Sequence, residues 1–234
     1  MTDIHEVHAP TWLDLYDYRQ RVGAMYRERD TALRMGEDAA VVVQRFRLAK
    51  DALYAKHPQS ALSSEDRQRF TGLPYFPYEP SLCVEAVLTP EPAETQGDDV
   101  LPASGPNTMR FPRAGRLDFT LAEQSLRLIV YWIDVYGGGL FLPFRDATSD
   151  NESYGGGRYL FDTVKGSDFL SLDADAPAAT QADPMGYGGG RILLDFNYAY
   201  NPSCAYDPRW ICPLAPNENQ LPLPINAGER AWHL

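Results

Sequence analysis

The sequence predicts an α+β fold that is mostly β: an antiparallel β-sandwich or barrel with an N-terminal helical hairpin and an irregular C-terminal wrap. Three observations predict it. Apolar residues follow a helical period in the first third of the chain, strand-like runs separated by turn residues fill the middle, and prolines without periodicity fill the end. Turns at such short intervals favour antiparallel pairing over βαβ units. We expect residues 1–72 to form the hairpin, packed on a β-rich domain of residues 73–234.

Two amphipathic helices are expected in the N-terminal region. Thr11 is suited to cap the first, with Asp14 in the third helical position, and Gly36 to end it. The second should end before Pro58, because the residue ahead of a proline disfavours helical backbone. The apolar faces consist of Trp12, Leu15, Tyr16, Val22, Tyr26 and Leu33 in the first helix, and Ala39, Val42, Val43, Phe46, Ala49 and Leu53 in the second.

Seven strand-like runs follow the segment LPYFPYEP, whose three prolines exclude a regular helix or a central strand. In one run, Leu117, Phe119 and Leu121 alternate with polar residues, which is typical of a strand with one solvated face. The run LRLIVYWI is almost entirely apolar and should be central. The expected strands are residues 82–88, 108–111, 116–121, 125–133, 140–144, 158–163 and 191–198, and long loops are expected at 89–107 and 172–190.

Glycine-rich segments recur along the chain. YGGGRYLFD at 154–162 is echoed by YGGGRILLD at 187–195, and a third YGGG lies at 136–139. None fits a phosphate-binding loop, because the lysine and the following helix of that motif are missing. The glycines suit hairpin turns. Alternatively, bare backbone could let a ligand approach, with Arg158 or Arg191 anchoring an anion.

Composition limits the classes of protein. The net charge is -11, which argues against non-specific binding of nucleic acid or of anionic membranes. No apolar run approaches the roughly 20 residues of a membrane span. The opening MTDIHEVHAP lacks the basic and apolar parts of a secretory signal, so we expect a cytoplasmic protein whose three cysteines are thiols.

Several fragments together resemble one family. They are residues 56–80, the segment FRDATSDNESYGGGRYL at 144–160, and LDFNYAYNPSCAYDPRWICPLAPNENQLPLPINAGE at 194–229. They resemble the bacterial and archaeal domain-of-unknown-function family numbered sixteen eighty-four, in its short form with a helical lead-in. Two residues depart from its pattern: Cys83 stands where a basic residue is expected, and Ser203 where a second proline is usual. The resemblance implies a fold region and a set of positions, and no activity.

A ligand site is expected around DFNYAYNPSCAY, residues 195–206. If this stretch begins as a strand, Asp195 and Asn197 point to one face and could form the floor of a polar pocket. Arg158 is available to meet an anionic group of a polar small molecule. The residues expected at the pocket are Arg158, Asp146, Asp195, Asn197, Tyr200, Asn201 and His57. The condition for this pocket is that Arg158 lies opposite Asp195 and Asn197 across a hollow.

Each of these residues also has a structural interpretation. The carboxylates of Asp146, Asp195 and Glu229 could pair with arginines, as buried charges require. Asn201 before a proline is a strong turn initiator. His57 suits the C-terminus of a helix, where the dipole favours a cation. The functional alternative for His57 is a general base.

Metal and thiol chemistry have weaker support. Cys204 and Cys212 lack the further ligands of a zinc site, so no metal or cofactor is expected. A divalent cation at Asp146, Asp195 and Asn197 and a Cys204–His57 pair are alternatives, and buried inert thiols are favoured.

Three functions follow in order of preference. The first is a small-molecule-binding domain with a polar pocket. The second is a hydrolase or lyase that uses a carboxylate or histidine as base, with Asp195 and His57 as the catalytic candidates. The third is a non-catalytic interaction protein that dimerises through the helical hairpin. For the chain in general, a monomer or a homodimer is expected.

Overall fold

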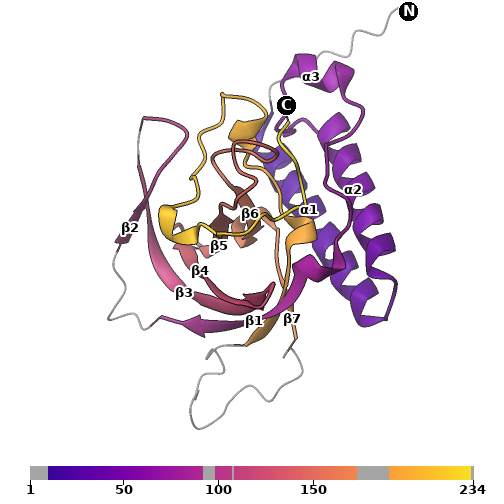
Figure 1. The fold of residues 1–234 in the computed structure, drawn as a ribbon. Helices are drawn as coiled ribbons and strands as arrows, with labels where there is room; N and C mark the ends of the chain where they lie inside the picture. The colour runs from indigo at the N-terminus through magenta and orange to yellow at the C-terminus, as the bar shows by residue number, and fades with distance from the viewer. Residues whose placement is uncertain (1–9, 92–97, 107, 173–189, 233–234) are drawn as a thin grey trace, which may run out of the picture.

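The structure, a computed structural model, describes residues 10–91, 98–106, 108–172 and 190–232. An antiparallel sheet curves into a half-barrel, and a pair of helices lies along one side of it (Figure 1). The α+β, mostly β fold class is therefore confirmed, with one curved sheet in place of two packed sheets. Most of the expected loop at 172–190, including the start of the second glycine echo, lies outside the described residues.

The helices begin and end where their capping residues predict. Helix α1 spans Trp12–Arg34, and Thr11 and Asp14 form a reciprocal capping box at its start. Gly36 follows its end with φ of 79°, a left-handed conformation that glycine adopts without strain. Helix α2 spans Ala39–Lys56 and ends two residues before Pro58, as predicted. A short helix that the sequence did not predict, α3, spans Ser64–Arg69.

The sheet has the strand order β6-β5-β4-β3-β1-β8-β7, and β2 pairs with β3 off this path. Every one of these pairings is antiparallel. The strands are β1 Cys83–Pro90, β2 Asp98–Leu101, β3 Met109–Leu121, β4 Gln124–Ile133, β5 Gly139–Phe144, β6 Arg158–Asp162, β7 Leu170–Ser171 and β8 Arg191–Asp195.

One long strand replaces two expected short ones. The runs at 108–111 and 116–121 join in β3, through a register shift between Arg113 and Gly115 where it pairs with β4. A Cβ atom at Gly115 would lie 2.6 Å from the Thr89 carbonyl oxygen, so only glycine permits the close approach of the paired strands β1 and β3 here. Strand β2 falls in part of the expected loop 89–107, because pairing with β3 gives this polar segment a partner.

The expected strand at 191–198 is too long. Strand β8 ends at Asp195, and a 3-10 turn, η4 at Phe196–Tyr198, follows. The Asp195 carboxylate ends the strand by accepting the backbone N–H of Asn197 at 2.9 Å. Asn197 therefore does not lie in the strand. The expectation that strand alternation places Asp195 and Asn197 on one face is wrong.

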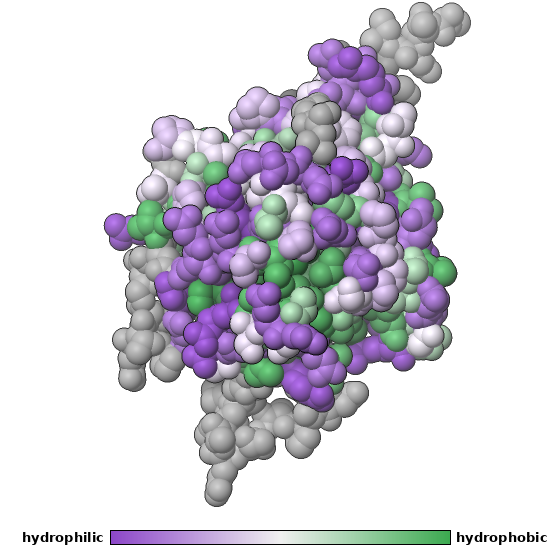
Figure 2. All heavy atoms as spheres, viewed as in Figure 1, coloured by the Kyte–Doolittle hydropathy of each residue, from purple (hydrophilic) through white to green (hydrophobic). Residues whose placement is uncertain are grey.

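The C-terminal segment closes the core. Leu221, Ile225 and Ala227 are almost completely buried in the main apolar cluster, against strand residues such as Leu117 and Phe144. Figure 2 shows hydrophilic residues over most of one face, with apolar residues gathered near its middle, between the curved sheet and the helices. The irregular C-terminal wrap thus covers the apolar face of the curved sheet, as a second sheet does in a β-sandwich.

The helical pair packs on the β-rich region through aromatic rings. Tyr26 of α1 and Phe46 of α2 meet Tyr198 of η4, with edge-on ring centroids 4.9 Å apart for Phe46 and Tyr198. The expectation that Trp12 and Tyr16 share the buried face is wrong, since their side chains are 85% and 63% exposed. Among the described residues, no helix is long and apolar enough to cross a membrane.

Candidate functional site

A pocket of about 310 Å³ lies between the helical pair and the β-rich region. Helices α1 and α2 form one wall, and the other comes from Tyr159 of β6, the turn after β6 and the C-terminal segment. Its volume falls at the lower end of the roughly 300–1,000 Å³ typical of small-molecule sites.

The pocket walls are largely apolar and aromatic. The side chains that give them this character are Leu15, Val22, Met25, Tyr26, Phe46, Leu53, Tyr54, Tyr159, Trp210 and Ile211. Tyr26 and Phe46 pack edge to face, with centroids 5.0 Å apart. Because each ring is held by its neighbours, the walls are preformed for an apolar body.

The charged groups on the pocket wall are all cationic. Arg19, Lys50 and Lys165 contribute to it, and no aspartate or glutamate is among the described lining residues. This is unexpected in a chain whose net charge is -11. The net negative charge of the whole molecule repels anions on average. These three cations therefore give the pocket a local preference for anions.

Lys50 is held deep in the pocket. Its Nζ lies 2.6 Å from the Glu229 carboxylate, 4.6 Å from the centroid of the Tyr200 ring and 5.5 Å from that of Tyr54. Glu229 also accepts hydrogen bonds from the Asn201 backbone N–H and the Tyr206 hydroxyl. This carboxylate therefore ties α2 to the C-terminal segment and fixes the ammonium group.

Arg19 is the least compensated of the three cations. Its Nε is buried, and no hydrogen-bond partner for that atom is found in the part of the chain that the structure describes. Lys165, by contrast, lies 3.5 Å from the Asp162 carboxylate. A buried guanidinium N–H without an acceptor is costly, so Arg19 would gain from a ligand that supplies one.

Hydroxyl groups form a second polar feature. The Ser167 and Tyr200 hydroxyls are 2.7 Å apart. Burial raises the pKa of Tyr200 well above its usual value and raises that of Tyr18 to about 12. Both phenols therefore stay protonated near neutral pH and can donate hydrogen bonds, but they are poor bases.

Of the seven residues predicted for the site, Tyr200 and Asn201 line this pocket. The other five belong to three separate networks. The ligand-binding roles of all seven stay predictions, because no ligand contact tests them.

Arg158 and Asp146 form the first network, which is completely buried. Arg158 Nη2 donates to Asp146 Oδ2 at 2.8 Å and to the Ile225 carbonyl at 2.9 Å, and Nη1 donates to the carbonyls of Ala227 and Glu229. The guanidinium thus holds three carbonyl groups of the C-terminal segment against β6. None of these partners is Asp195 or Asn197, and none of the three residues is among the described lining of the pocket.

Asp195 and Asn197 form the second network. The Asn197 amide accepts the Glu79 backbone N–H at 2.9 Å and donates to the Glu79 carbonyl and to Asp195 Oδ1. Burial raises the pKa of Asp195, while hydrogen bonds from Asn197 lower it in part. The two side chains join η4 to the segment ahead of β1.

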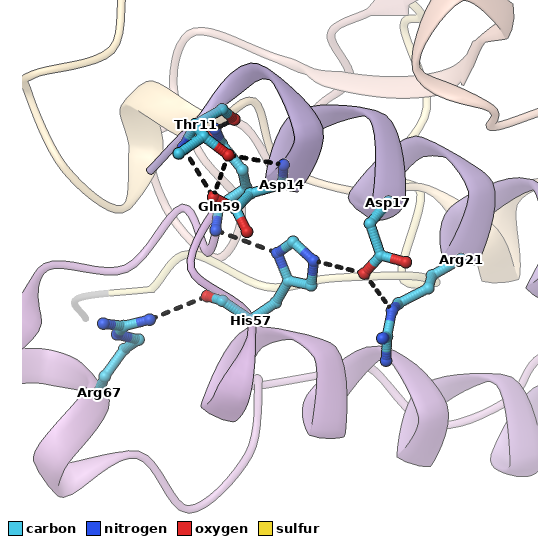
Figure 3. A network of polar contacts seen from close by, with 7 residues as sticks. All are labelled: Thr11, Asp14, Asp17, Arg21, His57, Gln59 and Arg67. Atoms are coloured by element: carbon cyan, nitrogen blue, oxygen red, sulfur yellow. Dashed lines mark hydrogen bonds and ion pairs between the residues drawn. The ribbon is translucent and has the colours of Figure 1, made fainter. Parts of the chain in front are cut away.

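His57 is the centre of the third network, between α1 and α2 (Figure 3). Its Nδ1 accepts the Gln59 backbone N–H at 3.0 Å, so the hydrogen on Nε2 faces Asp17 Oδ2 at 3.1 Å. Arg21 donates to the same carboxylate oxygen at 2.7 Å, and Arg67 donates to the His57 carbonyl. His57 is thus the C-cap residue of α2 and has a hydrogen-bond partner on each ring nitrogen, as its structural interpretation expects, although with Nδ1 as acceptor the ring is neutral and not the cation that the helix dipole would favour.

The sequence also offered metal and thiol candidates. Within the described residues, no group of three or more His, Cys, Asp or Glu side chains is placed to hold a metal ion. Cys83, Cys204 and Cys212 are free thiols. Cys212 lines the pocket, and none of the contacts found for Cys204 involves His57.

Sequence reasoning missed Arg19 and Lys50, although a signal was present. Lys50 lies four residues after Phe46 and three before Leu53, inside the apolar face of its helix. Arg19 lies four residues after Leu15 and three before Val22, in the same relation. A cation within an apolar stripe indicates either a buried partner or a polar cavity, and here both occur.

Comparison with known proteins agrees with this fold. The family described as "Protein of unknown function (DUF1684)" matches residues 68–230. The solution NMR structure of an uncharacterized protein from Haloarcula marismortui is 34% identical in sequence, with 80% of this chain and 91% of that chain covered and a TM-score of 0.53. No curated protein matches the chain. The family match begins after α2, so Arg19 and Lys50 lie outside it.

Proposed function

Since the chain belongs to the DUF1684 family of proteins of unknown function, we propose from the chemistry of the pocket that it binds a small molecule with an apolar body and an anionic group. The family that the sequence resembles is thus the right one. Its description assigns no activity, so the proposal rests on side chains alone.

The observation that carries the proposal is the sign of the charges in the pocket. Three cations and no described carboxylate line it, in a chain of net charge -11. Arg19 meets the anionic group, because its buried Nε has no other acceptor within the described chain. Hydrogen bonds to a charged acceptor are stronger than neutral ones, which favours carboxylate, sulfonate or phosphate over an uncharged polar group.

The aromatic walls determine the rest of the ligand. Rings at Tyr26, Phe46 and Tyr54 offer flat or edge-on contacts to an apolar body, and hydroxyls at Ser167 and Tyr200 can bond a second polar substituent. The volume of about 310 Å³ suits one or two fused rings or a medium-length alkyl chain.

Binding has more support than catalysis. A general base must reach the proton that it removes, directly or through one water molecule. Neither Asp195 nor His57 is among the described lining residues, and both side chains are occupied by structural hydrogen bonds. The hydrolase or lyase alternative would therefore require another base.

The test compares two probes of equal shape, 2-naphthoate and its uncharged amide, 2-naphthamide, by isothermal titration calorimetry. We expect naphthoate to bind about tenfold more tightly, as one partly buried charge-assisted hydrogen bond allows. The Arg19→Gln variant should lose that preference while still binding naphthamide. Arg27→Gln is the matched control, because Arg27 is an exposed arginine of the same helix outside this pocket.

Two results would contradict the proposal. One is equal affinity of the wild-type protein for the two probes. The other is an unchanged naphthoate preference in Arg19→Gln, which would place the anion elsewhere.

A further inference from the structure

Two of the three thiols are neighbours in space. Cys204 lies in the 3-10 turn η5, Ser203–Ala205, and its backbone N–H donates to Cys212 Sγ at 3.4 Å. The Cys212 sulfur therefore lies against the main chain of Cys204 itself. Both are reduced in the structure.

The backbone around Cys212 is fixed on both sides. Its N–H donates to the Ser104 hydroxyl at 2.9 Å, and its carbonyl accepts the Ser104 N–H at 3.0 Å. An antiparallel bridge joins Ala103 to Pro213 directly after it. Cys212 is therefore held beside η5, with its sulfur next to the Cys204 backbone.

The two thiols differ in their surroundings. Cys204 is half-buried, and its sulfur lies 3.7 Å from the Tyr154 hydroxyl. Hydrogen bonds from Cys212, and then from Ser104 and Tyr154, lower the pKa of Cys204. Cys212 is only 3% exposed, and its hydrogen bond to Cys204 together with burial raises its pKa. Cys204 therefore has the character of an attacking thiolate, and Cys212 that of the thiol that resolves the product.

We propose that Cys204 and Cys212 are a peroxide-sensitive pair that closes to an intramolecular disulfide. In the first step the Cys204 thiolate attacks a hydroperoxide oxygen, the O–O bond breaks, and Cys204 becomes a sulfenic acid while hydroxide or alkoxide leaves. In the second step the Cys212 sulfur displaces the hydroxyl group, which departs with the Cys212 proton as water. The two sulfurs are oxidised together, and one peroxide is reduced.

The position of the pair connects it to the pocket. Ser203 and Cys212 both line the pocket wall. Closing the disulfide draws these two segments together, so oxidation alters the wall opposite α1. The proposal that the two cysteines form a disulfide does not depend on the proposed ligand.

Cys83 is the third thiol, and the experiment removes it. Burial, with the nearby Asp195, raises the pKa of Cys83 to about 12, so it should react slowly with peroxide. The experiment uses the full chain with Cys83→Ser, which leaves only the pair. Near-equimolar hydrogen peroxide should remove both thiols together, with a mass loss of two hydrogen atoms and no dimer on a non-reducing gel.

Single removals assign the roles. Adding Cys212→Ser should leave a Cys204 sulfenic acid that dimedone traps, whereas adding Cys204→Ser should slow oxidation at least tenfold. Stepwise gain of oxygen atoms without a disulfide, or equal oxidation rates for the two single-thiol variants, would overturn the proposal. If a variant fails to fold, peptide mapping of the oxidised wild-type protein still decides, through the presence or absence of a Cys204–Cys212 linked peptide.

Discussion

At the scale of single residues, Arg158 illustrates how a buried charge is compensated. Its side chain is fully buried between the rings of Phe76 and Phe144, and its donors bond Asp146 and three main-chain carbonyls. A planar guanidinium can bond several acceptors in fixed directions, whereas an ammonium group acts as a point charge. Arg158 therefore organises the end of the chain in a way that no shorter cation could.

The first prediction concerns this residue. Arg158→Lys should lower the free energy of unfolding by about 3–5 kcal/mol, because buried carbonyls lose their donors and Asp146 loses a close partner. Urea denaturation measures the change. Arg191→Lys is the matched control, since Arg191 opens the second glycine echo but is exposed and paired with Glu85; it should cost about 0–1 kcal/mol.

The same variant tests the role that the sequence suggested. If Arg158 anchors an anionic ligand, the folded Arg158→Lys protein should bind 2-naphthoate less tightly than the Arg191→Lys protein. If the buried network is its whole role, both variants should bind naphthoate as the wild-type protein does.

At the scale of elements, the network around His57 joins two helices through an exposed carboxylate (Figure 3). Asp17 of α1 accepts from Arg21 and from His57, the residue that caps α2. These hydrogen bonds, that of Arg21 first, hold the pKa of Asp17 below its usual value of 3.8. The carboxylate is thus favoured in the folded state.

The second prediction is the resulting pH dependence. Because the folded-state pKa of Asp17 is depressed, its stabilisation is complete above about pH 4, shrinks as the unfolded chain takes up protons, and is lost as the pH falls through the folded-state value. The Asp17→Asn variant should therefore lose less stability than the wild type on acidification from about pH 5 to 3. Thermal unfolding monitored by circular dichroism at a series of pH values measures both profiles.

A control separates this effect from a change in net charge. Glu65→Gln also removes one carboxylate, from an exposed pair with Arg69 within α3. A flattened acid profile in both variants would mean that net charge, and not the hydrogen bonds of Asp17 with Arg21 and His57, causes the effect.

Some strands could be predicted from the sequence, and others could not. Leu117, Phe119 and Leu121 are all buried, as their alternation predicts, because a strand in a half-buried sheet exposes every second side chain. Strand β2 and strand β7 were missed, since each is short and exists through pairing with a distant segment. The prediction that Asn197 lies in a strand was wrong for a local reason. The Asp195 side chain competes with the strand ladder for backbone hydrogen bonds and starts a 3-10 turn.

The site was harder to predict than the fold. The carbonyls that bond Arg158 lie 67 to 71 residues later in the chain, and no local pattern reveals such partners. Tyr200 and Asn201 were placed at a ligand site from their polar character, and they do line the pocket. Arg19 and Lys50 lie within the apolar faces of their helices, and helical periodicity predicts a buried core there, not a cavity lined by cations.

At the scale of the whole molecule, contacts from both ends of the helical region bind it to the β-rich part. Arg29 of α1 donates to the Asp168 carbonyl at 3.1 Å, and the Trp210 indole donates to the Ala61 carbonyl at 3.1 Å. The pocket lies along this same junction. The division expected at residue 72 therefore stays a prediction about sequence segments, and we expect the two parts to unfold together.

The third prediction tests that coupling at Gly166, where the turn after β6 touches α1. Gly166 has φ of +88°, and a Cβ there would lie 2.8 Å from the Arg19 carbonyl oxygen and 2.9 Å from the Gly23 nitrogen. Gly166→Ala must therefore push helix α1 from the sheet, which adds about 1–3 kcal/mol of overpacking to the strain of the left-handed backbone. Gly36→Ala, at φ of +79° with nothing within 4 Å, isolates the backbone strain, at about 1–2 kcal/mol.

If the molecule unfolds as one unit, Gly166→Ala shifts the urea midpoints of far-ultraviolet circular dichroism and tryptophan fluorescence equally, and further than Gly36→Ala does. The two probes report on different regions, since helices dominate the dichroism while three of the four tryptophans, Trp132, Trp210 and Trp232, lie in β4 and the C-terminal segment. The fourth, Trp12 of α1, is already 85% exposed in the folded protein and changes its surroundings little on unfolding. A helical transition that precedes the fluorescence change in the wild-type protein would mean that residues 1–72 form a separate unit. The coupling would then be absent, and Gly166 would act on the docking of the helices alone.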